Sequence, residues 1–211
     1  MVVMSELKDK VVLITGAGKG SGRLLAAAFA AHGAIVAAND ISPINVEAVV
    51  AQIKAQGGRA AAYVHDVARK VAVQVLVKEV EDQWGRIDVL INHASVEPHS
   101  PLLEMDEWDW HRVLDVNLTG AFLMIQSVGR MMRAQGGGVI VNLISGADPG
   151  PRPERAEGAG KGRAAYLASM GGLLSLTHQA AAELAPKGVR VHAVELGGEN
   201  LVEIVMALCS E

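Results

Sequence analysis

A glycine-rich segment near the amino terminus has the residue types that bind a phosphate. Thr15-Gly-Ala-Gly-Lys-Gly-Ser-Gly22 lies between an apolar run at 11–14 and an Ala-rich run at 20–32. Glycines let backbone N–H groups approach a pyrophosphate, and the positive end of the following helix favours its charge. The residues predicted to form this phosphate site are Gly16, Lys19, Gly20, Ser21 and Gly22. The alternative is that the glycines only allow tight packing of a strand against a helix.

A carboxylate follows the second apolar run and extends the predicted site. Asp40 comes directly after the expected strand 35–39. At that position a carboxylate can accept hydrogen bonds from the ribose of an adenine dinucleotide, and it repels a 2′-phosphate. In the order strand, glycine turn, helix, strand and acid, the pattern is much more specific than a glycine turn alone. It predicts a dinucleotide site with NAD, rather than NADP, as the cofactor.

The elements that must position these residues alternate along the whole chain. Apolar runs typical of buried strands lie at 11–14, 35–39, 60–64, 87–91, 139–144 and 189–194. Helical patterns lie at 20–32, 43–56, 68–84, 105–134, 163–186 and 199–211. This alternation indicates βαβ units, and therefore an α/β fold: a Rossmann-like doubly wound parallel sheet of six strands in a single domain, 1–211. The Pro- and Gly-rich segment 148–162 is expected to be a surface loop.

Composition excludes several other classes of protein. The net charge is −4, which gives no reason to expect nucleic acid or an anionic membrane as a partner. The longest apolar stretch, 24–38, contains His32 and Gly33 and is too short to span a bilayer. The single cysteine, Cys209, fits a reducing, cytoplasmic environment. Seven histidines show no metal-ligand spacing, so no metal site is expected.

Several motifs in the expected order give the chain a family resemblance. The turn Thr15–Gly22 reads Thr-Gly-x-x-x-Gly-x-Gly, and Asp66-Val67 follows the third expected strand. Asn92-His-Ala94-Ser follows the fourth. With these motifs the chain resembles the short-chain dehydrogenase/reductase family over nearly its whole length. The resemblance implies that Asp66 and Val67 lie beside the adenine and that Asn92 and Ala94 belong to the cofactor site.

The same resemblance assigns remnants of a catalytic centre. Asn117 matches the helix Asn that the family uses to hold a proton-relay water. Ser145 matches the Ser that hydrogen-bonds the reacting oxygen, and Tyr166 matches the general acid and base. In the family a Lys follows this Tyr after three residues and lowers its pKa. Here that position is Met170, an uncharged thioether.

Other departures from the family pattern surround the cofactor and substrate positions. Ser95 replaces a Gly that leaves room beside the nicotinamide ribose, and the sixth-strand motif 191–197 has lost an Asn and a Pro. The final helix pattern follows Gly198 directly, where the family has a long substrate-covering loop. No seventh strand follows it in this sequence, so the family's lid and last strand are expected either to be absent or to lie in segments that this sequence omits.

The change to Met170 has a large expected effect on proton transfer. A free Tyr has a pKa of about 10, so only about one in a thousand is ionised at neutral pH. A cation that lowers this pKa by about 3 units contributes roughly 4 kcal/mol, or about a thousandfold in available base. Lys161 and Arg163 are the nearest cations before Tyr166, but they are expected to point away from the turn that carries residue 170. Met170 could also be a simple core residue.

These observations lead to one main hypothesis and two alternatives. The main hypothesis is a catalytically impaired subunit that assembles with an active homologous subunit in a heterotetrameric, NAD-dependent alcohol dehydrogenase, with hydroxyacyl-CoA thioesters among the candidate substrates. NAD would bind this chain or only its partner. The expected interface residues are Ala164, Ala165, Ala168, Gly171, Leu173, Leu174, Ala121, Met124, Ile125 and Val128. The alternatives are an active NAD-dependent dehydrogenase with a rearranged proton relay and an NAD-sensing binding module.

Overall fold

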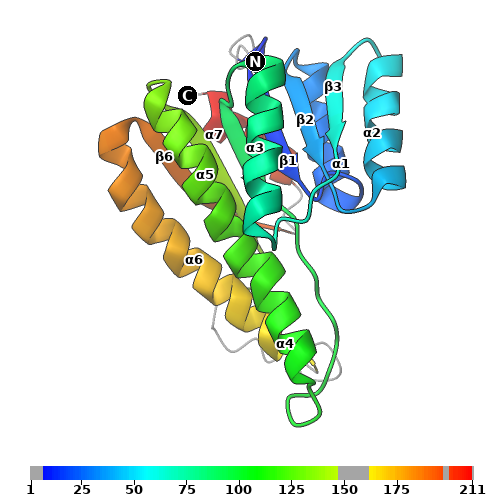
Figure 1. Cartoon of the computed structure of the whole chain (residues 1–211), viewed down its shortest axis with the longest axis vertical. Helices are drawn as coiled ribbons and strands as arrows, with labels where there is room; N and C mark the ends of the chain where they lie inside the picture. Colours follow the sequence, from blue (N-terminus) through cyan, green and yellow to red (C-terminus); the bar gives the residue numbers. More distant parts are fainter. Residues whose placement is uncertain (1–6, 147–161, 197–199, 211) are drawn as a thin grey trace.

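A parallel sheet forms the centre of the molecule in a computed structural model that describes residues 7–146, 162–196 and 200–210 (Figure 1). Its order is β3-β2-β1-β4-β5-β6. The strands are β1 (Val11–Thr15), β2 (Ile35–Asn39), β3 (Arg59–Tyr63), β4 (Val89–Asn92), β5 (Gly138–Ile144) and β6 (Val189–Glu195). All five pairings are parallel. The predicted six-stranded, Rossmann-like sheet is therefore confirmed.

Helices cover both faces of this sheet, because its strands present apolar side chains in both directions. Residues of α1 (Gly20–Ala31), α2 (Pro43–Ala55) and α7 (Leu201–Ser210) pack with Val12 and Ile14 on one face. Residues of α3 (Lys70–Trp84), α5 (Gly120–Ala134) and α6 (Ala164–Leu184) pack with Val11 and Leu13 on the other. Alternate residues of one strand thus serve two cores, as a doubly wound sheet requires.

The helix expected at 105–134 is divided into three parts. It comprises α4 (Glu107–Leu114), the π-helical turn η2 (Asp115–Thr119) and α5. Asp106 caps α4 by accepting a hydrogen bond from the Trp108 N–H at 2.7 Å. A π-turn inserts one extra residue per turn and is frequent at functional sites. Its position here matters because η2 carries Asn117.

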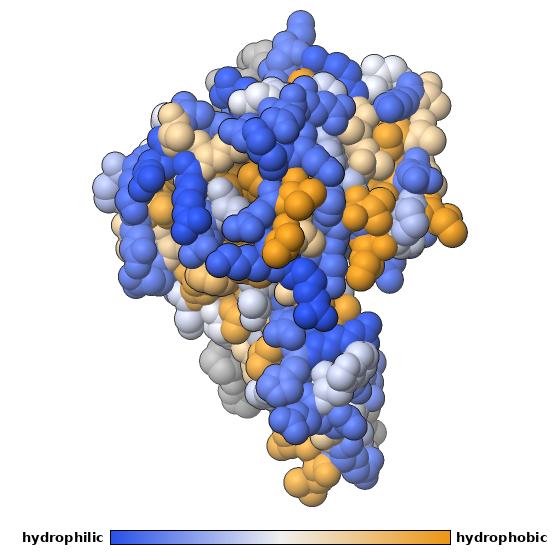
Figure 2. Space-filling view, in the orientation of Figure 1, coloured by the Kyte–Doolittle hydropathy of each residue, from blue (hydrophilic) through white to orange (hydrophobic). Residues whose placement is uncertain are grey.

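The lower end of the molecule in Figure 1 lies beyond the sheet and is formed by α4 and the start of α6. The segment before α4 is apolar at its tip, which is orange in Figure 2. Leu102 and Leu103 there are 69% and 98% exposed. Within the described ranges, no helix combines the length and apolarity that crossing a membrane requires.

Burial corrects the expected set of interface residues. Six of the ten residues pack in the chain's own core and are at most 6% exposed: Ala165, Leu173, Ala121, Met124, Ile125 and Val128. The apolar pattern of α5 and α6 is therefore explained mainly by contacts within the chain. Ala164, Gly171 and Leu174 are partly exposed and Ala168 is exposed, so these four remain available on the surface. The segment 148–161 lies outside the described residues, and its expected loop structure stays a prediction.

Candidate functional site

The glycine turn joins β1 to α1, and two of its glycines are required by close packing. Gly16 has φ +66°, and a Cβ there would lie 2.8 Å from the Cα of Ala94. A Cβ on Gly22 would lie 2.4 Å from the carbonyl oxygen of Gly16. For these two positions the packing explanation is sufficient. Gly20 differs, because its φ is +57° and a Cβ there would meet nothing within 4 Å.

The amino-terminal end of α1 has the features of an anion site. Lys19 is the N-cap residue and makes no side-chain capping hydrogen bond, and the first turn contains no acidic residue. Lys19 and Gly20 are exposed, and Ser21 is half-buried. The first N–H groups of a helix need acceptors from outside the helix, and the helix dipole favours an anion there. The donor set therefore fits the pyrophosphate of a dinucleotide.

Asp40 supports the turn directly, a role that the sequence did not predict. One carboxylate oxygen accepts a hydrogen bond from the Gly18 N–H at 2.9 Å, and the other accepts from the Ser42 N–H at 2.9 Å. The residue is buried, with 8% of its surface exposed. Each carboxylate oxygen can accept a second hydrogen bond. The predicted contact of Asp40 with a ribose is compatible with this geometry and stays a prediction.

His93 fastens the glycine turn to the end of β4. Its Nδ1 lies 3.0 Å from the carbonyl oxygen of Gly16, so Nδ1 carries the proton and donates. The hydroxyl oxygen of Thr15 accepts from the backbone N–H groups of His93 and Ala94, at 3.1 and 3.2 Å. Burial lowers the pKa of His93, although the contact with Gly16 and the charge of Asp40 oppose this effect. The imidazole is therefore kept neutral by its surroundings.

Asp66 and Val67 lie between β3 and α3. Asp66 makes a hydrogen bond there, whereas Val67 packs as an apolar residue. An Asp66 carboxylate oxygen accepts from the Ala68 N–H at 2.9 Å. Val67 is buried, and a Cβ on Gly120 would lie 3.1 Å from one of its methyl groups. Val67 thus packs against the start of α5. The predicted position of Asp66 and Val67 beside an adenine stays a prediction.

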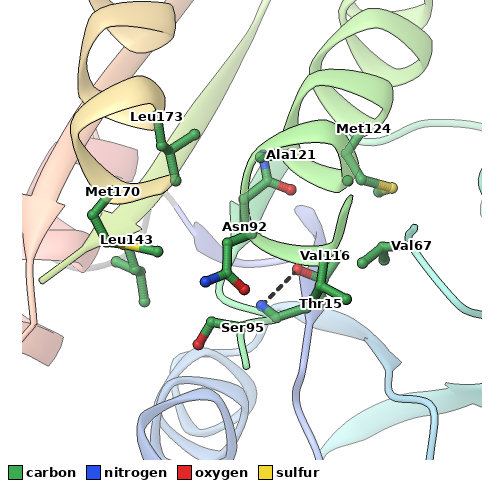
Figure 3. A pocket seen from close by; sticks show the side chains of 13 residues that line it. Thr15, Val67, Asn92, Ser95, Val116, Ala121, Met124, Leu143, Met170 and Leu173 are labelled. Atoms are coloured by element: carbon green, nitrogen blue, oxygen red, sulfur yellow. Dashed lines mark hydrogen bonds between the residues drawn. The ribbon is translucent and has the colours of Figure 1, made fainter. Parts of the chain in front are cut away.

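Some of the predicted cofactor and catalytic residues line one small cavity (Figure 3), whereas Ser145, Tyr166 and the predicted residues of the phosphate site do not. Its volume is about 10 Å³, which is room for about one water. The predicted residues that line it are Val67, Asn92, Ala94, Ser95, Asn117 and Met170. The cavity therefore brings together β4, η2 and α6, which are far apart in sequence.

Asn92 is the least satisfied polar group of this cavity. Its Nδ2 donates to Oδ1 of Asn142 at 2.8 Å, and Asn142 in turn donates to the Thr177 hydroxyl at 2.8 Å. Its Oδ1 is buried and accepts no hydrogen bond from any described residue. A buried acceptor without a donor costs about 1–3 kcal/mol, so it marks a place where a donor is missing.

Asn117 clamps the chain that follows β4. Its Oδ1 accepts from the Val96 N–H at 2.8 Å, and its Nδ2 donates to the Val96 carbonyl at 3.0 Å. The same Nδ2 contacts the Ser169 hydroxyl at 3.0 Å. The side chain thus holds Val96 and α6. The predicted role of Asn117 in a proton relay stays a prediction.

Ser145 and Tyr166 meet as predicted, but position 170 supplies no charge. Ser145 follows β5 and is hydrogen-bonded to the Tyr166 side chain. Met170, one turn further along α6, is 2% exposed and packs in an apolar cluster with Tyr166, Ile144 and Leu173. Burial is the main cause that raises the pKa of Tyr166, while the hydrogen bond from Ser145 opposes it. The phenol is therefore held neutral.

Arg163 contacts the Tyr166 ring, which was not predicted from the sequence. Its expected position away from the turn that carries residue 170 stays a prediction. The guanidinium carbon lies 5.0 Å from the centroid of the Tyr166 ring, and Nε is paired with the Glu97 carboxylate. An Arg three positions before a Tyr at the start of a helix shares its face, which is the signal that sequence reasoning passed over. Lys161 lies outside the described residues. In the described residues, no group of three potential metal ligands occurs.

Comparison with known proteins gives consistent matches over most of the chain. The family model for short chain dehydrogenases matches residues 10–208. A 3-oxoacyl-[acyl-carrier-protein] reductase of Synechocystis sp. is 40% identical over 195 residues, which cover 92% of this chain and 76% of that protein. The (2S)-[(R)-hydroxy(phenyl)methyl]succinyl-CoA dehydrogenase subunit BbsD of Thauera aromatica is 37% identical over 191 residues, 90% of this chain and 73% of that subunit.

A solved structure extends the match to the whole backbone. A metagenomic short-chain oxidoreductase in complex with NADP superposes with a TM-score of 0.88 at 29% identity, covering 98% of this chain and 93% of that one. The chain spans about three-quarters of the length of the two curated relatives.

Proposed function

The chain belongs to the short-chain dehydrogenase family, and from that premise we propose that it is a subunit of a nicotinamide-dependent oxidoreductase whose own reaction centre is impaired. Met170 carries this proposal. It places an apolar side chain, 2% exposed, where the family has the cation that activates the tyrosine. The retained contact of Ser145 with Tyr166 positions the phenol but does not ionise it, because burial acts in the opposite direction.

The cofactor half of the site supports binding of a dinucleotide. The turn and the start of α1 would hold its pyrophosphate through backbone N–H groups and Lys19. Asp40 would accept from a ribose hydroxyl, which favours NAD, whereas the solved relative named above binds NADP. A bound nicotinamide supplies the hydride acceptor or donor of the reaction. The chain's own residues would hold it at the carboxyl ends of β1 and β4.

A partner with an intact lysine would supply the chemistry. One relative bears the name of a dehydrogenase subunit, which supports assembly with a second kind of chain. The surface of α6 and α5 offers contacts for such an assembly through Leu167 and Phe122, which are 40% and 42% exposed, and through the exposed Ala168. We propose a heterotetramer with an active homologue, in which this chain stabilises the assembly.

A second candidate function is an active dehydrogenase with a rearranged relay. Arg163 favours it, because a guanidinium over the Tyr166 ring is a cation near the phenol. Its pairing with Glu97 weakens the case, since the two charges partly cancel. The impaired subunit therefore remains the main proposal.

Met170→Lys is the direct test. The purified chain is assayed with NAD and NADP on secondary alcohols and 3-oxoacyl thioesters. We expect Met170→Lys to raise kcat by up to about a thousandfold, because an ammonium beside Tyr166 restores the lost base. Met170→Leu is the matched control and should leave the rate at the wild-type level. Asn92 lines the same cavity as Met170, and its Oδ1 accepts no hydrogen bond from any described residue.

Two results would contradict the proposed function. If the wild-type homo-oligomer turned over at the rate of Met170→Lys, the proposal of an impaired centre would be wrong. Co-expression with a homologue that retains the lysine tests the assembly separately. Separation of the two chains on size exclusion would contradict the heterotetramer.

A further inference from the structure

An ion pair lies on the face of the acid/base tyrosine. We infer that Arg163 is the cation that acts on the Tyr166 hydroxyl in this chain, and that Glu97 cancels its effect. The inference rests on the proposed function and deepens it, because it gives the impaired centre a second cause beside the missing lysine. Glu97 and Arg163 would then be positioning residues that set the protonation of Tyr166.

The position of Arg163 is fixed by the start of α6. Arg163 is the N-cap residue of this helix, and Tyr166 lies three residues later on the same face. The guanidinium carbon lies 5.0 Å from the ring centroid, within the range of a cation–π contact. Its side chain is 17% exposed, so water screens its charge only partly.

The position of Glu97 is fixed by the segment 96–100, which is held at both ends, at Val96 and at Ser100. Asn117 binds both backbone groups of Val96. The Ser100 N–H donates to the Gly162 carbonyl at 3.0 Å, and a Cβ on Gly162 would lie only 2.6 Å from the Ser100 nitrogen. Between these two anchors, Glu97 pairs with Arg163. The carboxylate is therefore held beside the guanidinium rather than free in solvent.

The two charges act on Tyr166 in opposite directions. A carboxylate nearby disfavours the phenolate and a guanidinium favours it. Glu97 and Arg163 are the charged groups among the described residues that face this side chain, and Glu97 has the larger effect of the two. Ser145 and Met170, its other neighbours named above, are uncharged. Together, the two charges of the ion pair do not favour ionisation of the Tyr166 phenol.

Removing the Glu97 carboxylate should leave the Arg163 guanidinium without its ion-pair partner. Glu97→Gln keeps the hydrogen-bonding shape and deletes one negative charge. The proton of the Tyr166 hydroxyl would then leave to solvent more easily, because the phenolate faces an unopposed guanidinium. No electron transfer is involved in this step.

Tyrosine titration by NMR tests the inference without cofactor or substrate. The full chain contains two tyrosines, so ¹³Cζ-tyrosine labelling gives two signals, and Tyr166→Phe assigns them. We expect Glu97→Gln to lower the pKa of Tyr166 by about one unit and Arg163→Gln to raise it, the scale of an opposite charge at close range. Glu47→Gln, an exposed acid on α2, is the matched control and should change neither signal.

Tyr63 serves as an internal reference, because the charge that acts on it is Glu79 and not Glu97. Arg163→Lys keeps the charge and should leave the pKa of Tyr166 near the wild-type value, which separates charge from fold if Arg163→Gln is unstable. An unchanged Tyr166 pKa in both Glu97→Gln and Arg163→Gln would overturn the inference. Met170→Lys addresses the proposed function alone: if its kcat rises while the ion-pair variants have no effect, only the inference fails. If its kcat does not rise while those variants shift the pKa, only the proposed function fails.

Discussion

The two halves of the site differ in how well their polar groups are satisfied. At the glycine turn, Asp40, His93 and Thr15 together fasten β1, β2 and β4 with hydrogen bonds of 2.9 to 3.2 Å. At the cavity below β4, the Asn92 oxygen has no donor and Met170 adds only apolar surface. The groups named at the glycine turn are thus all hydrogen-bonded, while the cavity contains a buried acceptor without a donor and an uncharged side chain at position 170. Two neighbouring parts of one site can therefore differ in how well their polar groups are satisfied.

The largest effect is expected at the better-satisfied half. Gly22→Ala should destabilise the chain by about 3 kcal/mol or more, because the new Cβ would lie 2.4 Å from the Gly16 carbonyl oxygen. Urea unfolding measures this. Gly57→Ala is the control: its φ is also positive, at +81°, but its surroundings are open, so the cost should be only about 1 kcal/mol. Equal costs would mean that the turn is less tightly packed than described.

A smaller loss is expected in the catalytic half. Asn142→Ala would leave the Asn92 amide and the Thr177 hydroxyl without their buried partner, at a cost of about 2–3 kcal/mol. Asn45→Ala, at an exposed position on α2, provides the comparison and should cost well under 1 kcal/mol. If urea unfolding gave the same free energy for both variants, the buried amide chain would carry no stability.

The smallest effect is a pH dependence from His93. Burial lowers the folded-state pKa of this imidazole below its ordinary value of about 6.5. The unfolded chain therefore binds the extra proton first, and stability falls as pH drops below about 6.5, until the folded pKa is passed. His93→Asn, compared with His111→Asn on exposed α4, should flatten this slope in urea titrations. A slope that persists in His93→Asn would assign it to another group.

Much of the fold was predictable because each strand is a short apolar run between turn residues. Asp40, Ser145 and Tyr166 could be placed because they sit at strand ends or on helices whose bounds the pattern indicates. The division of 105–134 at η2 could not be predicted, since one extra residue in a single turn is a local change that the apolar pattern of a long helix does not report. Six of the ten expected interface residues lie in the core instead, because small apolar side chains suit a core and a subunit contact equally.

Most of the contacts that were not predicted from the sequence join residues far apart in the chain. His93 and Gly16 are 77 residues apart, and Glu97 and Arg163 are 66 apart. No local pattern reports such pairs, because they depend on which loops meet at the carboxyl edge of the sheet. The position of Arg163 relative to Tyr166 was the exception: helical spacing alone could have suggested it.

The Asn92 Oδ1 oxygen, which accepts no hydrogen bond from any described residue, bears on the return of a lysine at position 170. The codons of methionine and lysine, ATG and AAG, differ by one base. Asn92 and Met170 line the same cavity, so a lysine at position 170 would enter a cavity that already contains an acceptor without a donor. Under the proposed function, one base change in this codon would supply the missing ammonium group.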